Sequence, residues 1–269
     1  MLTQRLLVII VLLPLGILLV AFGGIPFYLF LTIILALAAW EYSQLFHKGG
    51  WKPAGPLIIT GVAVIALSRA FFNFQFGETL ISLLVLIAMA YHLYKYEKGR
   101  DEAPIDFCIT VAGILYIGWL GSYMISLRNL PNGLWWFMLV LPAAWLADSG
   151  AYLVGTRFGK HKMAPRLSPR KTWEGYFGGA ICGVLGGMLL AALWGMRFPG
   201  LTLEKGAVIG LVMGVLPPLG DLGESMFKRM VGSKDSSNLL PGHGGIFDRI
   251  DSWIWAGVLG VVLITGFWL

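Results

Sequence analysis

The chain has 269 residues, of which 57% are hydrophobic and only 13% are charged, whereas about a quarter of the residues of a soluble domain are charged. Apolar stretches long enough to cross a bilayer recur from one end to the other, which excludes a soluble enzyme, a disordered chain and a disulfide-stabilised scaffold. Stretches such as residues 80–90 are apolar on every face, so we expect transmembrane helices and not a transmembrane barrel.

Apolar runs of about twenty residues predict nine membrane-spanning helices. In chain order they cover residues 5–22, 25–46, 56–72, 78–95, 106–127, 133–155, 173–196, 206–228 and 251–268. The expected fold class is an all-α, polytopic integral membrane protein. The largest polar stretches are the loops 156–172 and 229–250, so we expect the chemistry to lie there.

The basic residues alternate between the two sides of this predicted topology. Sixteen of the 20 Lys and Arg residues lie on the side of the N-terminus, and four lie on the other side. The positive-inside rule therefore predicts a cytoplasmic N-terminus and places both long polar loops in the cytoplasm. This topology also accounts for the net charge of +6. No basic stripe interleaved with aromatic residues indicates a nucleic acid partner, and we expect none.

Two of the predicted helices carry glycine at every fourth position. Such rows let helix backbones approach closely in lipid, so we expect the seventh and eighth spans to pack tightly together. The rows are Gly179, Gly183 and Gly187 in one helix, and Gly206, Gly210 and Gly214 in the next.

Three acidic residues, Asp148, Asp221 and Glu224, interrupt or end otherwise apolar spans. A carboxylate is costly there, which favours a functional role over the alternative of a buried ion pair that fixes helix packing. Two prolines precede Asp221, and Glu224, Ser225 and Lys228 follow it at i+3, i+4 and i+7. These four side chains would share one face of a helix.

The segment after this helix is rich in charge and glycine. Asp oxygens suit a hard cation such as Mg²⁺, cationic side chains neutralise phosphate oxygens, and glycine lets backbone amides approach them. The combination predicts a polyphosphate site. The residues concerned are Lys228, Arg229, Lys234, Asp235, His243, Gly244, Gly245, Asp248, Arg249 and Asp251. His243 has no second His or Cys at ligand spacing, so we expect it to form hydrogen bonds or face phosphate.

The other polar loop ends in Ser168-Pro169-Arg170-Lys171-Thr172-Trp173-Glu174. Serine followed by proline predicts that Ser168 caps a helix whose free amides and dipole attract an anion. Arg170 and Lys171 would strengthen this anion site. A capped helix with charges that only anchor it at the membrane surface is the alternative interpretation.

The 27 positions from Ser225 to Asp251 resemble the signature of the CDP-diacylglycerol synthases, also called phosphatidate cytidylyltransferases. Residues 148–152 and 168–175 also resemble this family, although Arg170 stands where the family commonly has Lys. The resemblance covers residues 145–269, whereas the first 130 residues share only their hydrophobic character. We therefore expect N-terminal helices without a recognisable motif in residues 1–130 and a catalytic region in residues 131–269, which carries both polar loops.

The resemblance implies that the chain transfers the cytidylyl group of CTP to phosphatidate, giving CDP-diacylglycerol and pyrophosphate for phospholipid biosynthesis. Its implied cofactor is Mg²⁺, with a second cation if the site holds two metals. The first-choice metal ligands are Asp221 and Asp248, followed by Asp148, Glu224 and Asp251. Lys171, Lys228 and Arg229 complete the implied catalytic set. The implied substrate contacts are Ser168, Arg170, Thr172, Glu174, Ser225, Lys234, Asp235, His243, Gly244, Gly245 and Arg249.

The family resemblance further implies a homodimer in the lipid bilayer. The short polar N-terminus is more typical of a bacterial protein, so we expect the cytoplasmic membrane, with the active site facing the cytoplasm. Two alternatives stay open at this point. One is another membrane nucleotidyl- or phosphotransferase acting on a polyprenyl or related lipid. The other is a lipid transporter, against which the lack of visible inverted halves argues.

Overall fold

The computed structural model describes residues 13–237, 239 and 244–269. Within them, eight helical segments are long and apolar enough to cross a membrane. Eight of the nine predicted spans are thereby confirmed, as is the all-α polytopic membrane fold. The first predicted span, residues 5–22, begins among residues outside the described part. Its described residues, Leu13–Phe22, form an apolar helix that is shorter than a membrane span. The total of nine spans and the cytoplasmic N-terminus stay predictions.

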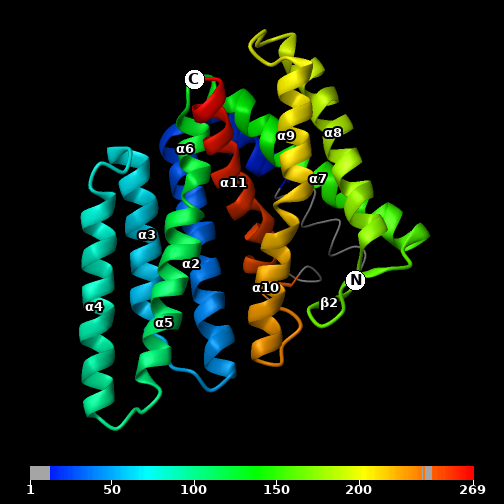
Figure 1. Ribbon diagram of the computed structural model, residues 1–269. Coiled ribbons are helices and arrows are strands. Elements are labelled where there is room, and N and C mark those ends of the chain that lie inside the picture. Colours follow the sequence, from blue (N-terminus) through cyan, green and yellow to red (C-terminus); the bar gives the residue numbers. More distant parts are fainter. Residues whose placement is uncertain (1–12, 238, 240–243) are drawn as a thin grey trace. The chain divides into compact units, whose positions relative to one another are not determined.

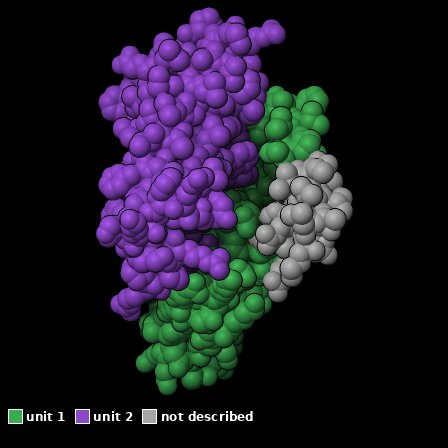
Figure 2. Space-filling model, turned by 90° about the vertical axis from the view of Figure 1, so that its right-hand side faces the viewer, with its two compact units in different colours: residues 1–126, 227–250 green, residues 127–226, 251–269 purple. Residues whose placement is uncertain are grey.

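The chain forms two compact units, which are coloured separately in Figure 2. Unit 1 contains residues 1–126 and 227–250, and unit 2 contains residues 127–226 and 251–269. Two helices, α10 (Pro218–Met230) and α11 (Phe247–Phe267), contribute residues to both units. The two ends of the signature stretch, residues 225–230 and 247–251, therefore lie on helices that contribute to both units.

Unit 1 is built mainly from α2 (Gly24–Lys48), α3 (Gly55–Phe72), α4 (Gly77–Glu97) and α5 (Ala103–Gly113) (Figure 1). The last of these continues through a π-helical segment, η1 (Ile114–Leu120), towards α6 (Tyr123–Asn129). A Cβ atom on Gly118 would lie 3.1 Å from the backbone Cα of Val62. Glycine at this position therefore allows η1 to pack directly against α3.

Unit 1 also buries the polar side chains of Arg69 and Asp106, and both form hydrogen bonds. The Arg69 guanidinium donates to Ser122 Oγ at 2.8 Å and lies 4.1 Å from the ring centroid of Tyr123. Asp106, which is 1% exposed, accepts hydrogen bonds from the Lys52 amide at 2.8 Å and from Arg100 Nε at 2.9 Å. These contacts offset the cost of placing charge inside an apolar bundle.

Unit 2 contains α7 (Gly133–Phe158), α8 (Trp173–Gly195) and α9 (Leu203–Val215), together with most of α11 and the first part of α10. A short antiparallel hairpin, β1 (Lys162–Ala164) and β2 (Ser168–Thr172), joins α7 to α8. The predicted close packing of the two glycine-rich helices is confirmed. A Cβ atom on Gly183 would collide with the carbonyl oxygen of Gly210, and one on Gly187 with that of Gly206.

The two prolines at positions 217 and 218 separate α9 from α10. Helix α9 ends at Val215, and α10 restarts at Pro218, where proline is tolerated because the first helical turn needs no N–H donor. The carbonyl oxygen of Val215 accepts a hydrogen bond from the Tyr176 hydroxyl at 3.0 Å. The helix is therefore interrupted at residues 216 and 217.

Candidate active site

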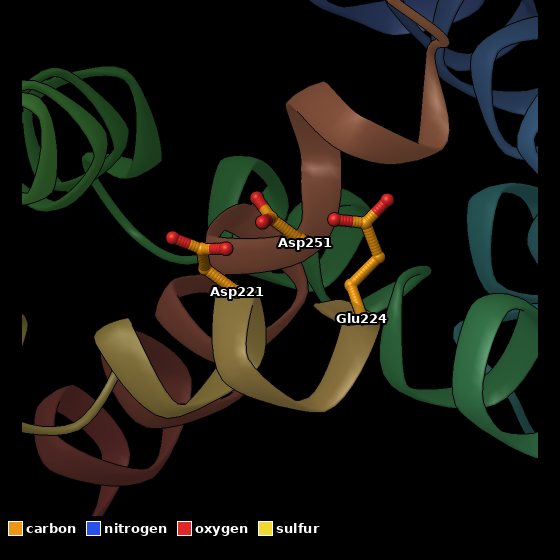
Figure 3. A group of neighbouring side chains, drawn as sticks. All are labelled: Asp221, Glu224 and Asp251. Carbon is orange, nitrogen blue, oxygen red and sulfur yellow. The ribbon is translucent and has the colours of Figure 1, made fainter. Parts of the chain in front are cut away.

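Three carboxylates of unit 2 converge on one space between α10 and α11. Asp221 and Glu224 lie on α10, Asp251 lies on α11, and their ligand oxygens all lie within 4.8 Å of one another (Figure 3). Glu224 is 1% exposed and Asp251 6% exposed, whereas the Asp221 side chain is 35% exposed. Within the described residues, this is the single group of three or more side chains that could hold a metal ion.

The local sequence explains why these carboxylates meet. Asp221 and Glu224 are three residues apart, which places them on one face of α10 as predicted. Gly220 lets the first turn of α10 approach α11, because a Cβ atom there would lie 2.6 Å from the carbonyl oxygen of Asp251. The missing side chain at position 220 thus brings Asp251 within reach of the α10 carboxylates.

Lys171 supplies a positive charge beside these acids. Its Nζ atom lies 2.7 Å from Asp221 Oδ2 and donates a hydrogen bond to the carbonyl oxygen of Pro218 at 3.2 Å. Ser225 Oγ lies 3.5 Å from Asp221 Oδ1. The three carboxylates offer this space oxygen ligands of the kind that suits a hard divalent cation. The residues present therefore fit the Mg²⁺ that the sequence predicts.

The structure corrects the predicted role of Ser168. Ser168 to Thr172 form strand β2, which pairs with β1, and the helix begins four residues later than expected. Thr172 is the N-cap of α8, since its Oγ1 atom accepts a hydrogen bond from the Gly175 amide at 3.2 Å. The prediction of an Ser168 cap is wrong because pairing with β1 satisfies this stretch as a strand. Substrate contacts of Ser168 and Thr172 stay predictions.

Glu174 lies in the first turn of α8 and connects it to the chain before the hairpin. Its carboxylate accepts hydrogen bonds from the amides of Lys160 and His161, at 3.1 and 3.2 Å, and contacts His161 Nδ1 at 2.5 Å. The hairpin that presents Lys171 is therefore closed at its base by Glu174. Direct contact of Glu174 with substrate stays a prediction.

A second group of signature residues lies in unit 1 and is organised by Asp248. Lys228 Nζ donates to its Oδ1 atom at 2.7 Å. The amides of Ser236 and Gly245 donate to its Oδ2 atom at 3.0 and 2.8 Å. Gly244 has a φ of 80°, a conformation that favours glycine, and a Cβ atom there would lie 2.9 Å from Asp248 Oδ2. Asp248 thus fixes the backbone around the signature glycines.

The remaining predicted residues lie at the surface or outside the described part of the chain. Arg229, Lys234, Asp235 and Arg249 are exposed in unit 1, and Asp148 and Arg170 are exposed in unit 2. His243 lies outside the described residues. The structure therefore groups Asp221, Glu224, Asp251 and Lys171 in one unit, and Lys228, Asp248, Gly244 and Gly245 in the other. Asp148 and Asp248 as metal ligands stay predictions, as do the substrate contacts of the exposed residues.

Sequence reasoning missed one residue that contacts the signature segment, Glu41 of α2. Its buried carboxylate accepts hydrogen bonds from side chains and amides of residues 236–247. A signal was present, because Glu41 is an acidic residue within a predicted apolar span, as are the three acids that were singled out.

Fold and site together define a polytopic membrane protein with a carboxylate and lysine site suited to phosphate chemistry. The model of the Cytidylyltransferase family matches residues 3–267. The chain belongs to this family.

Curated relatives match nearly the whole chain. The phosphatidate cytidylyltransferase of Pseudomonas aeruginosa is 36% identical over 264 residues, which cover 94% of this chain and 93% of the relative. The phosphatidate cytidylyltransferase of Brucella suis is 32% identical over 256 residues, covering 88% and 83%. That of a Synechocystis species is 30% identical over 286 residues, covering 96% and 94%. The similarity therefore includes the N-terminal helices as well as the signature.

Proposed function

We propose that this chain transfers the cytidylyl group of CTP to phosphatidate, forming CDP-diacylglycerol and pyrophosphate. It is a nucleotidyltransferase of phospholipid synthesis, as the cytidylyltransferase family and the relatives named phosphatidate cytidylyltransferase indicate. The observation that carries the proposal is the group formed by Asp221, Glu224 and Asp251, with Lys171 2.7 Å from Asp221. The carboxylates supply negative charge for a metal ion, and the lysine supplies positive charge for the phosphates of a nucleotide.

The reaction needs no protein nucleophile. A phosphate oxygen of phosphatidate forms a bond to the α-phosphorus of CTP, and the bond from that phosphorus to the bridging oxygen breaks, so pyrophosphate leaves. The protein accelerates this step by aligning the two substrates and by neutralising the charge that develops on the phosphate oxygens. Lys171 would donate to these oxygens from strand β2. Lys228 and Arg229 would bind the triphosphate from the end of α10.

The cofactor that suits the carboxylate group is Mg²⁺, held by Asp221, Glu224 and Asp251. When bound, the cation neutralises phosphate charge and stabilises the leaving pyrophosphate. Lys171 would then exchange its contact with Asp221 for a contact with substrate phosphate. Both oxygens of Asp248 already accept hydrogen bonds from the protein, so we assign it the role of holding the signature glycines in place. A second cation bound by Asp248 stays part of the prediction from sequence.

The active site would face the cytoplasm, where CTP is made, and the protein would lie in the cytoplasmic membrane of a bacterium. The bias of basic residues towards one side supports this orientation. The family resemblance also favours a homodimer. Light scattering on the purified protein in detergent would measure its mass directly and would distinguish a dimer from a monomer.

The decisive experiment supplies the purified protein with labelled CTP, phosphatidate and Mg²⁺ and separates the lipid products. We expect labelled CDP-diacylglycerol and release of pyrophosphate, and loss of both when EDTA is added. A parallel reaction contains a polyprenyl phosphate instead of phosphatidate. Product with the polyprenyl phosphate alone would reassign the enzyme to a different lipid, and product with neither would refute the proposal.

A further inference from the structure

The carboxylate of Glu41 is fully buried near the end of α2 and accepts four hydrogen bonds from the signature segment. Its Oε1 atom accepts from Ser237 Oγ at 2.5 Å and from the Ile246 amide at 3.0 Å. Its Oε2 atom accepts from Ser236 Oγ at 3.2 Å and from the Phe247 amide at 2.7 Å. Each oxygen therefore contacts both ends of the segment 236–247, so one side chain closes the segment at its base.

The packing around this carboxylate leaves little room for adjustment. A Cβ atom on Gly245 would collide with Ser236 Oγ and would lie 2.5 Å from Glu41 Oε2. The neighbouring residue on α2, Tyr42, has its ring edge-on to Phe227 and Phe247, with centroid distances of 5.7 and 5.9 Å. Contacts of this kind fix α2 against the ends of both helices that flank the segment.

The Glu41 contacts also extend to Asp248. Ser236 Oγ lies 3.2 Å from Glu41 Oε2 and 2.8 Å from Asp248 Oδ2, and its single proton can be donated to either carboxylate. The Phe247 amide, which donates a hydrogen bond to Glu41, lies at the start of α11. Free amides and the helix dipole favour a negative charge there. Glu41 thus acts as a helix cap supplied by a distant part of the sequence.

We propose that Glu41 is a positioning residue, which holds residues 236–237 and 245–247 in the arrangement that binds the CTP triphosphate. The carboxylate touches neither substrate nor reacting atoms and acts through Ser236, Ser237 and the backbone at residues 246 and 247. The reference to CTP rests on the proposed function, whereas the anchoring of the segment does not. An N-terminal helix outside the recognisable motifs thereby takes part in nucleotide binding.

Asp106 offers a matched control for a test of the anchoring itself. Asp106 is a buried carboxylate of the same unit that also accepts a hydrogen bond from a backbone amide. Its donor is the amide of Lys52, which lies outside the signature segment. We would measure hydrogen–deuterium exchange in wild type, Glu41→Gln and Asp106→Asn. Glu41→Gln should accelerate exchange of the backbone amides of residues 246 and 247 about tenfold or more. It should leave the exchange rate of the Lys52 amide unchanged. Asp106→Asn should give the reverse pattern.

Kinetics of the same variants would test the consequence for the nucleotide. A carboxamide keeps the shape of Glu41 but offers one acceptor oxygen where the carboxylate offers two. We expect Glu41→Gln to lower kcat/KM for CTP about 10- to 100-fold, mainly through KM. The KM for phosphatidate should change less than about threefold, and Asp106→Asn should leave the CTP parameters within about twofold of wild type.

Two outcomes would overturn the proposal. One is unchanged amide exchange at residues 246 and 247 in Glu41→Gln. The other is a decrease in kcat/KM for CTP in Glu41→Gln that is no larger than the decrease in Asp106→Asn. If Glu41→Gln does not fold, Ser237→Ala removes one donor to the same carboxylate and decides the question, since it should raise the KM for CTP severalfold. A wild-type protein that makes no CDP-lipid would refute the proposed function, while the exchange experiment would still decide whether Glu41 anchors the segment.

Discussion

Acidic side chains inside apolar helices take two distinct forms in this protein. Asp221, Glu224 and Asp251 place their oxygens within 4.8 Å of one another, an arrangement of like charges that favours a bound cation. The carboxylate oxygens of Glu41 and Asp248 instead accept hydrogen bonds from donors of the protein itself. The difference lies in what surrounds each carboxylate and not in its type, so a direct measurement of metal binding can separate the two groups.

We expect Asp221→Asn and Asp251→Asn to weaken the binding of Mn²⁺, which takes the same oxygen ligands as Mg²⁺. The loss should exceed the roughly 10- to 100-fold that a missing outer partner of a metal site costs. Titration followed by electron paramagnetic resonance measures this binding without turnover. Asp248→Asn should bind Mn²⁺ as wild type does, and so should Glu204→Gln, an exposed acid of unit 2. Weakened binding in Asp248→Asn would make Asp248 a ligand, as the sequence predicts.

At the level of single residues, the sequence indicates which side chains share a helix face. It does not indicate which side chains from distant parts of the chain contact one another. Asp221 and Glu224 could be placed on one helix face from their spacing alone. The family resemblance ranks Asp248 above Asp251 as a ligand, and this ranking stays a prediction. The sequence does not reveal that the amides of Ser236 and Gly245 donate hydrogen bonds to Asp248. Glu41 was missed for a related reason, since its partners lie about two hundred positions further along the chain.

Among the structural elements, the β-hairpin before α8 shows how local signals can compete. The Ser-Pro pair is typical of a helix start, but β2 continues past it, and the cap is Thr172. Helix patterns were predicted to within a few residues elsewhere, because apolar runs of this length have one favourable structure in lipid. A short polar strand between two helices lacks such a constraint, so its pairing could not be derived from sequence.

Within this hairpin, Lys171 and Thr172 should respond differently to alanine. Thr172→Ala removes a cap and should lower the free energy of unfolding by about 1 kcal/mol. Lys171→Ala should remove the proposed charge-assisted contact to phosphate, worth about 1.5–3 kcal/mol, and lower kcat/KM roughly 10- to 150-fold. Thermal unfolding in detergent and steady-state kinetics measure the two effects. Lys162→Ala, on the paired strand, should affect neither, and wild-type kinetics in Lys171→Ala would remove Lys171 from the site.

The contact between α8 and α9 depends on glycine, and a single methyl group should disturb it. Gly183→Ala would push a Cβ atom against the carbonyl oxygen of Gly210, and we expect a loss of about 1–3 kcal/mol in the free energy of unfolding. Gly266→Ala is the control, because a Cβ atom there meets nothing within 4 Å. Equal unfolding temperatures for the two variants would show that the glycine row is not needed for packing.

At the scale of the whole molecule, hydrophobicity predicts the helices and the basic residues predict the orientation. Eight spans are found where the apolar runs place them. The predicted regions, residues 1–130 and 131–269, stay a prediction. The sequence does not indicate that unit 1 combines the N-terminal helices with residues 227–250. Such a combination depends on contacts between distant parts of the chain, and neither periodicity nor composition reports on those contacts.

The predicted orientation can be tested by labelling single cysteines in a background that lacks Cys108 and Cys182. Arg166→Cys in the hairpin turn and Ser233→Cys after α10 should react with a membrane-impermeant thiol reagent only after the cells are opened. Pro199→Cys, between α8 and α9, should react in intact cells. Labelling of Arg166→Cys from outside would reverse the topology and contradict a cytoplasmic CTP site.

The break at Pro217 and Pro218 has a geometric consequence for the carboxylates. In a continuous helix, Asp221 would follow Gly214 by seven residues, or about two turns, and would point in nearly the same direction. The glycine face of α9 is directed at α8, where a Cβ on Gly214 would lie 2.7 Å from the Cα of Ala180. An unbroken helix would thus have turned Asp221 towards α8. Restarting the helix at Pro218 resets its rotational phase, so the glycine face of α9, which packs against α8, and the charged face of α10 are free to point in different directions.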